Sequence, residues 1–353
     1  MSTENPFKGV EAKAEAKTKR YEVAPGVLVD VSYEEFGAKT NKGKTPELSK
    51  SKERDTAERA TIFLPGWAVT ASDGAMKGLS QAFADSAEGK VYTVTTRSEK
   101  VDEKADQIYE EAQAISKFIK ERGIKEVTLA GHSQGGDKAI NVARILQSDP
   151  ELAIDGLILL SPVGLYEQKP LGVAGRFAKD TLLDTPPTLA GDVLKNKRFT
   201  VSNRGMRAAM DIVMNIVKEI GKSGVDYPKR LKKEVSEMSE LNPRLPEIQV
   251  PVVIVAGAQD PVSNPRRIVP KMEEEKIMKQ WEEEQATEKE GDSIDPREEF
   301  LKDNVFPRSP YVRMVIPEKL GHHGLPHFRP ESVANASMYL LKRYQRRLRS
   351  KSV

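Results

Sequence analysis

The sequence predicts an α/β fold with a mostly parallel central sheet that is covered by helices on both faces. Short apolar runs rich in β-branched residues recur along the chain, and several end at glycine or proline, as buried strands do. These runs are Thr61–Leu64, Val91–Thr96, Glu126–Ala130, Leu157–Leu160 and Val250–Gly257. They are largely continuous rather than alternating, which indicates strands that are buried on both faces. Segments long enough for a helix separate them, and parallel strands need such connections.

The remaining elements are expected around these runs. The alternating residues from Val27 to Tyr33 predict a first strand with one buried face. Helices are expected over Glu103–Arg122, Asp137–Gln147 and Glu331–Leu348, and a last strand over Tyr311–Ile316. In the first of these helices apolar side chains recur near the helical period, and Gly123 provides a C-terminal stop.

The chain of 353 residues suits one large domain that carries an insertion, or two domains. Residues 1–20 are charged and alanine-rich, and we expect them to form an N-terminal tail. Residues 21–162 and 246–353 are expected to form the core. Residues 163–245 interrupt the strand–helix rhythm and are rich in Gly, Pro, Lys and Met, so we interpret them as an inserted cap with an amphipathic helix near Met206–Ile220.

Charge and composition exclude several classes of protein. Lys and Arg number 56 against 53 Asp and Glu, and a formal net charge of +3 predicts no strong field for nucleic acid. The chain has no cysteine, which excludes disulfides, thiolate zinc sites and a cysteine nucleophile. No apolar run approaches the roughly 20 residues that cross a bilayer, and residues 1–20 do not resemble a signal peptide. We therefore expect a cytoplasmic protein without an integral membrane segment, in which the Glu/Lys-rich residues 271–303 form an exposed helical excursion.

The strongest chemical signal is Gly131-His132-Ser133-Gln134-Gly135, which directly follows a predicted strand and precedes a predicted helix. A serine hydroxyl is a poor nucleophile unless its oxygen is exposed and a base can take its proton. A sharp strand-to-helix turn provides that exposure, and glycines on either side of the serine leave room for the turn. The pattern predicts that Ser133 is a nucleophile.

A serine nucleophile of this kind needs a histidine base, and the chain has only four histidines. His132 lies beside the nucleophile within the turn and cannot face Ser133. His322, His323 and His327 cluster just after the last predicted strand. His322 follows a glycine, whereas His323 has the better spacing to the last helix. The sequence does not separate these two, with a slight preference for His323, and His327 is the third candidate.

Asp260 is the candidate acid that would orient the histidine. It follows the apolar run Val252–Gly257, so it lies at the carboxyl end of a predicted strand, on the same sheet edge as Ser133. Asp85, Asp102 and Asp155 lack this setting.

Four segments together resemble the α/β-hydrolase family, over roughly residues 21–345 apart from the insertions. They are Tyr33–Gly37, Phe63–Trp67, Gly131–Gly135 and Gly257–Val262, which resemble the opening hairpin strand, the oxyanion-hole loop, the nucleophile turn and the acid loop of that family. The order Ser, Asp, His is also the family's order. The resemblance implies a capped α/β-hydrolase fold of the serine, esterase- or lipase-like kind. It further implies an oxyanion hole that is made by the backbone N–H groups of Trp67 and Gln134, and a base after the last strand.

The expected function is cleavage of a carboxylic ester, thioester or amide in a small-molecule acyl substrate, through an acyl-enzyme on Ser133. An acyltransferase or thioesterase with the same three residues is the alternative, because the pocket chooses the acceptor of the acyl group. A non-catalytic ligand-binding role on the same fold is a further alternative. The resemblance implies no organic cofactor, and the histidine cluster lacks the carboxylate pattern that a metal site would require.

Overall fold

A computed structural model of the chain describes residues 16–38, 58–67, 74–99, 105–179, 227–265, 296–317 and 330–351. Its strands form one eight-stranded sheet in the order β1-β2-β4-β3-β5-β6-β7-β8. The strands are β1 Lys17–Ala24, β2 Val27–Phe36, β3 Arg59–Leu64, β4 Lys90–Ser98, β5 Glu126–His132, β6 Ala153–Leu160, β7 Val252–Val255 and β8 Val312–Val315. Neighbouring strands from β4 to β8 pair in parallel, whereas β2 is antiparallel to both β1 and β4. The predicted mostly parallel α/β sheet is confirmed.

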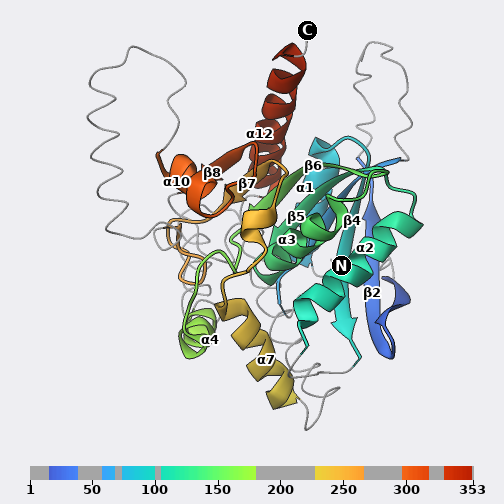
Figure 1. Cartoon of the computed structure of the whole chain (residues 1–353), viewed down its shortest axis with the longest axis vertical. Helices are drawn as coiled ribbons and strands as arrows, with labels where there is room; N and C mark the ends of the chain where they lie inside the picture. Colours follow the sequence, from blue (N-terminus) through green and yellow to red (C-terminus); the bar gives the residue numbers. More distant parts are fainter. Residues whose placement is uncertain are drawn as a thin grey trace, which may run out of the picture.

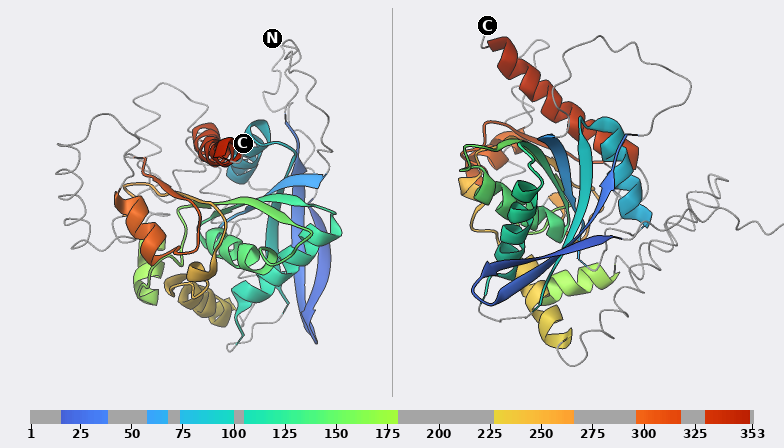
Figure 2. Two further views of the ribbon diagram at one scale, coloured as in Figure 1. Left: turned by 45° about the horizontal axis from the view of Figure 1, so that its top comes forward. Right: turned by 90° about the vertical axis from the view of Figure 1, so that its right-hand side faces the viewer.

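The described helices connect or flank these strands. They are α1 Gly74–Ser86, α2 Gln107–Glu121, α3 Gln134–Leu146, α4 Pro170–Lys179, α7 Tyr227–Ser239, the short 3-10 helix η4 Leu245–Glu247, α10 Pro296–Asn304 and α12 Pro330–Lys351. Helices α2 and α3 lie on one face of the sheet, and α1 and α12 lie on the other (Figures 1 and 2).

Alternate residues of the central strands explain the two covered faces. In β6, Leu157 and Leu159 pack in the group of buried side chains that includes those of α2 and α3. Ile158 and Leu160 pack in a second group, with side chains of α1 and α12. Successive side chains of a strand point to opposite faces, so a run of four apolar residues supplies both layers. The continuous apolar runs in the sequence therefore reflect two-sided burial.

Three parts of this fold differ from the sequence-based expectation. Strand β1 begins at Lys17, inside the segment that was expected to be a tail, and pairs with β2. Helix α1 has no counterpart in the expected elements. Within the predicted exposed excursion, α10 buries Leu301 and Glu298 against the sheet edge, because it covers the last strand.

Helix α10 closes the β8 edge of the sheet. The Glu298 carboxylate accepts a hydrogen bond from the backbone N–H of Met314 at 3.1 Å and pairs with the Arg313 guanidinium at 2.5 Å. A carboxylate thus occupies the position where a further strand would supply a carbonyl oxygen. The edge strand is partly satisfied within the chain.

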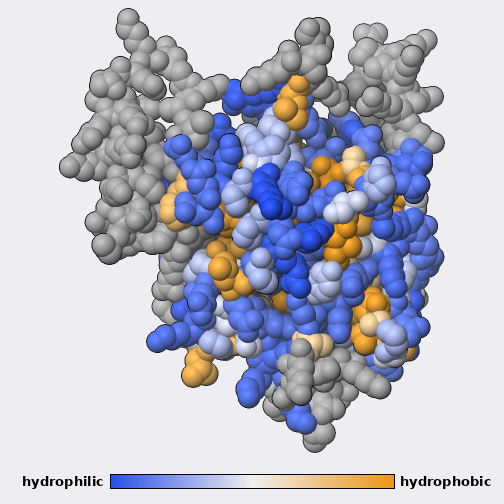
Figure 3. Space-filling view, in the orientation of Figure 1, coloured by the Kyte–Doolittle hydropathy of each residue, from blue (hydrophilic) through white to orange (hydrophobic). Residues whose placement is uncertain are grey.

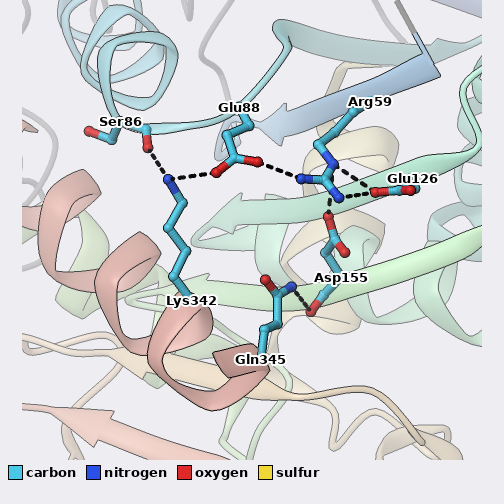
Figure 4. A network of polar contacts seen from close by, with 7 residues as sticks. All are labelled: Arg59, Ser86, Glu88, Glu126, Asp155, Lys342 and Gln345. Atoms are coloured by element: carbon cyan, nitrogen blue, oxygen red, sulfur yellow. Dashed lines mark hydrogen bonds and ion pairs between the residues drawn. The ribbon is translucent and has the colours of Figure 1, made fainter. Parts of the chain in front are cut away.

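A polar network joins the amino ends of the central strands (Figure 4). The Arg59 guanidinium, at the start of β3, binds Glu88 at 2.7 Å, contacts Glu126 at the start of β5, and lies 3.7 Å from Asp155 of β6. Lys342 of α12 lies 3.6 Å from the same Glu88. The network links the strands to one another and to the helix that covers them.

Helices α4 and α7 lie at the opposite end of the sheet, beyond the carboxyl ends of its strands (Figure 1). They belong to the segment expected to form a cap, and the helix expected near Met206–Ile220 lies outside the described residues. On the face seen in Figure 3, hydrophobic residues form separate small groups among hydrophilic ones. Among the helices that the structure describes, none combines the length and the apolarity that crossing a bilayer requires.

Candidate active site

Ser133 stands at the sharp turn between β5 and α3. Its backbone has φ 54° and ψ −123°, a conformation that residues with a side chain rarely adopt. Such a conformation costs of the order of 1–3 kcal/mol and persists only where the surrounding structure enforces it. Here the Ser133 N–H donates to the carbonyl of Leu160 at 2.9 Å, and its carbonyl accepts from Gly136 at 2.9 Å. The Ser133 hydroxyl does not cap the helix that it precedes.

The glycines around Ser133 are required by close backbone contacts. A Cβ atom at Gly131 would lie 2.2 Å from the carbonyl oxygen of Gly135. A Cβ atom at Gly135 would lie 2.0 Å from the carbonyl oxygen of Leu64, which ends the neighbouring strand β3. The second glycine thus makes room for a neighbouring strand, not only for the turn itself. The helix begins at Gln134, three residues before the predicted start, because the turn leads into it directly.

The turn after β3 lies directly against this serine. A Cβ atom at Gly66 would be 3.0 Å from the Ser133 Cβ and 3.2 Å from the His132 Nδ1 atom. Trp67 follows in the chain. Gln134 is the first residue of α3, so its N–H has no acceptor within the helix. The two residues expected to supply the oxyanion hole therefore flank the same serine.

Asp260 lies at the carboxyl end of β7, as the sequence predicts, and is fully buried. Its Oδ1 atom accepts hydrogen bonds from the backbone N–H groups of Val262 at 2.8 Å and Ser263 at 2.7 Å. Backbone donors of this kind stabilise an ionised carboxylate. The carboxylate is thus held by its own loop at a fixed place on the sheet edge.

The segment after β6 joins the serine turn to the Asp260 loop. Val163 donates its N–H to the Ser133 carbonyl at 3.3 Å, while the Pro162 carbonyl accepts from the Ser263 hydroxyl at 2.6 Å. The Tyr166 hydroxyl also donates to the Val262 carbonyl at 3.0 Å. Because β6 lies between β5 and β7, one segment fixes the spacing of both loops.

The candidate bases His322, His323 and His327 lie outside the described residues, so which of them serves stays a prediction. His132 is 2% exposed within the turn. The described residues hold no group of three His, Asp or Glu side chains that is placed to bind a metal ion.

A cluster of apolar side chains, the roof cluster, covers the carboxyl ends of the central strands. It combines Val163 and Val173 with Met238 of α7 and Val262 of the Asp260 loop, and Trp67 and Val235 pack against it. Its members come from the loops of the site and from α4 and α7, the described helices of the segment expected to form a cap. Ser133 is only 3% exposed, so the serine lies below a covering rather than at an open surface.

Two buried carboxyl groups lie near the roof cluster. Burial raises the pKa of Asp137, in the first turn of α3, to about 7, although the Asn242 amide donates a hydrogen bond to it. Burial likewise raises the pKa of Glu237 of α7 to about 8, and the Lys233 ammonium 3.7 Å away offsets this only in part. Both groups are protonated more readily than ordinary carboxyl groups.

Sequence reasoning missed the residues that hold the site in place. The Asp260-x-x-Ser263 spacing is a local signal for the loop that binds its own aspartate, since such side chains often bond backbone two or three residues on. Glu234 of α7 accepts a hydrogen bond from the Trp67 indole N–H. These two residues are 167 positions apart, so no local pattern predicts the contact.

Comparison with solved structures supports the same architecture. The chain is similar to an esterase from Thermogutta terrifontis, with 15% identity, a TM-score of 0.52, and coverage of 94% of this chain and 99% of that one. It is also similar to a probable hydrolytic enzyme from Pseudomonas aeruginosa, with 15% identity, a TM-score of 0.53, and coverage of 94% and 95%. At such identities the likeness shows the α/β-hydrolase fold alone.

A search of curated proteins found no match to the sequence. The family model described as serine aminopeptidase, S33, matches residues 64–289, which is more than half of the chain. The matched range contains the turn at Ser133 and the loop at Asp260. The chain therefore belongs to the serine aminopeptidase S33 family and has the α/β-hydrolase fold.

Proposed function

We propose that this protein is a serine hydrolase that cleaves a carboxylic ester through an acyl-enzyme on Ser133. The observation that carries the proposal is the strained backbone of Ser133 at the end of β5. The turn of Pro65, Gly66 and Trp67 packs against it. Strain that the surrounding contacts enforce is typical of residues that present a reacting group.

In the proposed reaction the Ser133 Oγ attacks the substrate carbonyl and its proton passes to a histidine. His323 is the preferred base and His322 the alternative, with Asp260 holding the imidazole in the required tautomer. The backbone N–H groups of Trp67 and Gln134 would donate to the oxyanion that forms. The histidine then returns the proton to the leaving alcohol, and water releases the acyl group by the same steps. The reaction as proposed uses no metal or organic cofactor.

The covering of the site supports a small-molecule substrate with an apolar acyl group. Residues 163–245 would act as the cap, and the Val163, Val173, Met238 and Val262 side chains would contact the acyl chain beneath it. The family description names an aminopeptidase, so an amide or thioester substrate and transfer of the acyl group to another acceptor are the competing reactions.

The test is labelling with a fluorophosphonate probe beside turnover of p-nitrophenyl acetate, butyrate and decanoate and an aminoacyl p-nitroanilide. Wild type is expected to be labelled and to hydrolyse the esters, and Ser133→Ala to do neither. Ser337→Ala is the matched control, because it removes a buried serine hydroxyl from α12, away from the site. A folded wild type that is neither labelled nor active would contradict the proposal and favour a ligand-binding role.

The same assays separate the candidate bases. His323→Ala is expected to lower kcat by about 10³-fold or more, as removal of a general base does, while His327→Ala keeps most activity. A large loss of kcat in His322→Ala, with most activity kept in His323→Ala, would assign the base to His322. If the aminoacyl anilide is turned over faster than every ester, the proposed reaction becomes peptide-bond cleavage instead of ester cleavage.

A further inference from the structure

The described cap helix α7 is bonded directly to the turn that is expected to supply the oxyanion hole. The Trp67 indole N–H donates to the Glu234 carboxylate, and both side chains are partly buried. An indole N–H is a donor only, and a bond to an ionised acceptor is stronger than a neutral one. The contact therefore restrains the Trp67 side chain from the cap side.

Helix α7 is a fixed support for this contact. Its Lys233 ammonium donates to the Ala105 carbonyl at 2.5 Å, and its Glu237 carboxyl group accepts from the Gln107 N–H at 3.3 Å. At its end, the Ser239 carbonyl accepts from the Gln168 N–H at 2.7 Å. Glu234 lies within a helix that is tied to the core on both sides of it.

The other end of the contact reaches the serine. Trp67 follows Gly66, where a Cβ atom would lie only 3.0 Å from the Ser133 Cβ, so the backbone at Gly66 lies close against the serine. The peptide between Gly66 and Trp67 carries the Trp67 N–H. Which side-chain rotamer a residue can adopt depends on its backbone φ and ψ, so a restraint on the Trp67 indole favours one backbone conformation of Trp67. Oxyanion donors act at 2.7–3.1 Å from the developing charge, so small displacements reduce their effect.

We propose that Glu234 is a positioning residue that sets the Trp67 backbone N–H toward the oxyanion by holding the Trp67 indole. This role rests on the proposed function, since it requires Trp67 to be an oxyanion donor. It couples the cap to the reaction: displacement of α7 releases the indole and lowers the rate of the chemical step.

The test measures kcat and KM for p-nitrophenyl butyrate, with the rate of fluorophosphonate labelling, in Glu234→Ala, Glu234→Gln, Trp67→Phe and the double variant Trp67→Phe/Glu234→Ala. Glu234→Ala and Trp67→Phe are each expected to lower kcat about tenfold, a part of what a lost oxyanion donor costs. KM should change little, and labelling should slow in parallel. Glu234→Gln should keep most of the activity, because its amide oxygen still accepts from the indole. The double variant should be no slower than either single variant.

Lys232→Ala, at an exposed position on the same helix, is the control and should leave kcat unchanged. Circular dichroism and the melting temperature verify the fold of each variant. If Glu234→Ala does not fold, Trp67→Phe breaks the same hydrogen bond from the other side. An active wild type with unchanged kcat in Glu234→Ala, or multiplying losses in the double variant, would overturn the positioning role alone. A wild type without labelling or turnover would overturn the proposed function and this role with it.

Discussion

At the amino ends of β3, β5 and β6, Arg59 lies among carboxylates of opposite charge (Figure 4). At the carboxyl ends of the same strands, Ser133 and Ser161 have positive φ angles of 54° and 43°. One end contains ordinary backbone and complementary charges. The other contains strained backbone and buried carboxyl groups whose pKa values are raised.

One sheet thus has two kinds of interaction at its two ends. Charge pairs at the amino ends favour the folded chain, whereas strain and burial of Asp137 at the carboxyl ends oppose it. The hydrophobic layers between them offset that cost. Substitutions at the amino ends should therefore change stability without changing activity, whereas only substitutions at the carboxyl ends should change activity.

The largest expected effect is on activity at the carboxyl end. If Asp260 orients the histidine base as proposed, Asp260→Asn should lower kcat by about 10³- to 10⁴-fold, because an amide cannot hold the imidazole in the required tautomer. Its oxygen can still accept from Val262 and Ser263, so the free energy of unfolding should change little. Kinetics with an ester and urea denaturation measure the two quantities.

Asp155→Asn is the matched change at the amino end. It weakens the Arg59 network and should lower stability slightly while leaving kcat unchanged. Equal losses of activity in the two variants would remove the distinction between the ends.

The next effect is on the fold. Gly135→Ala would place a Cβ atom 2.0 Å from the carbonyl oxygen of Leu64, and backbone cannot yield as a side chain can. We expect a loss of about 3 kcal/mol in the free energy of unfolding, at the upper end for overpacking. Differential scanning calorimetry gives the change in melting temperature.

Gly78→Ala in α1 is the control, since a Cβ atom there would meet nothing within 4 Å. It should stabilise the protein by about 0.5–1 kcal/mol, because alanine favours the helix. A Gly135→Ala variant as stable as wild type would mean that the serine turn and β3 can separate at little cost.

The third effect depends on pH. Since the folded pKa of Asp137 is raised to about 7, the folded state binds a proton that the unfolded state releases near pH 4. Its contribution to stability is thus complete below about pH 4 and is lost as the pH rises through about 7. Urea denaturation between pH 5 and 8 should show wild type losing about 2 kcal/mol relative to Asp137→Asn.

Asn242 should keep its hydrogen bond to the amide oxygen in that variant, which mimics the protonated acid. Parallel pH profiles for wild type and Asp137→Asn would show that Asp137 ionises normally in the folded protein.

The smallest effect is at the amino end itself. Arg59→Met removes the cation shared by Glu88, Glu126 and Asp155 and should cost about 1–2 kcal/mol at low salt. The cost should fall in 1 M NaCl, where exposed charges are screened. Melting temperatures at two salt concentrations measure it.

Lys125→Met, which breaks only the exposed pair with Glu58, should cost less than about 0.5 kcal/mol. Activity should not change in either variant. A lower kcat in Arg59→Met would show that the amino-end network influences the site.

The sequence predicts the central strands and the serine turn because both depend on local patterns. Continuous apolar runs identify β5, β6 and β7, and glycines around Ser133 identify the turn. Helix α1 escapes prediction because its two glycines lower helix propensity, and packing of Met76, Leu79 and Phe83 outweighs them. Strand β1 escapes because its first four residues, 17–20, are polar and exposed, and only Tyr21 and Val23 pack against the core.

In the site, too, local sequence patterns predict some features, and contacts between distant segments determine the others. Asp260 is recognisable from its place after an apolar strand, and the loop residue Ser263 has a local signal in its spacing. The Trp67–Glu234 contact and the burial that raises the pKa of Asp137 arise only when distant segments meet. Tertiary structure, not propensity, determines those features.

The contact of Glu298 with the Met314 N–H has a consequence for self-association. An open edge strand can pair with another copy of the chain and begin an intermolecular sheet. Helix α10 limits that opportunity at β8, and the exposed charges of β1, among them Lys17, Lys19 and Arg20, disfavour it at the far edge. Partial unfolding that frees α10 first would therefore expose the β8 edge, so protection of that edge depends on how firmly this one helix is held.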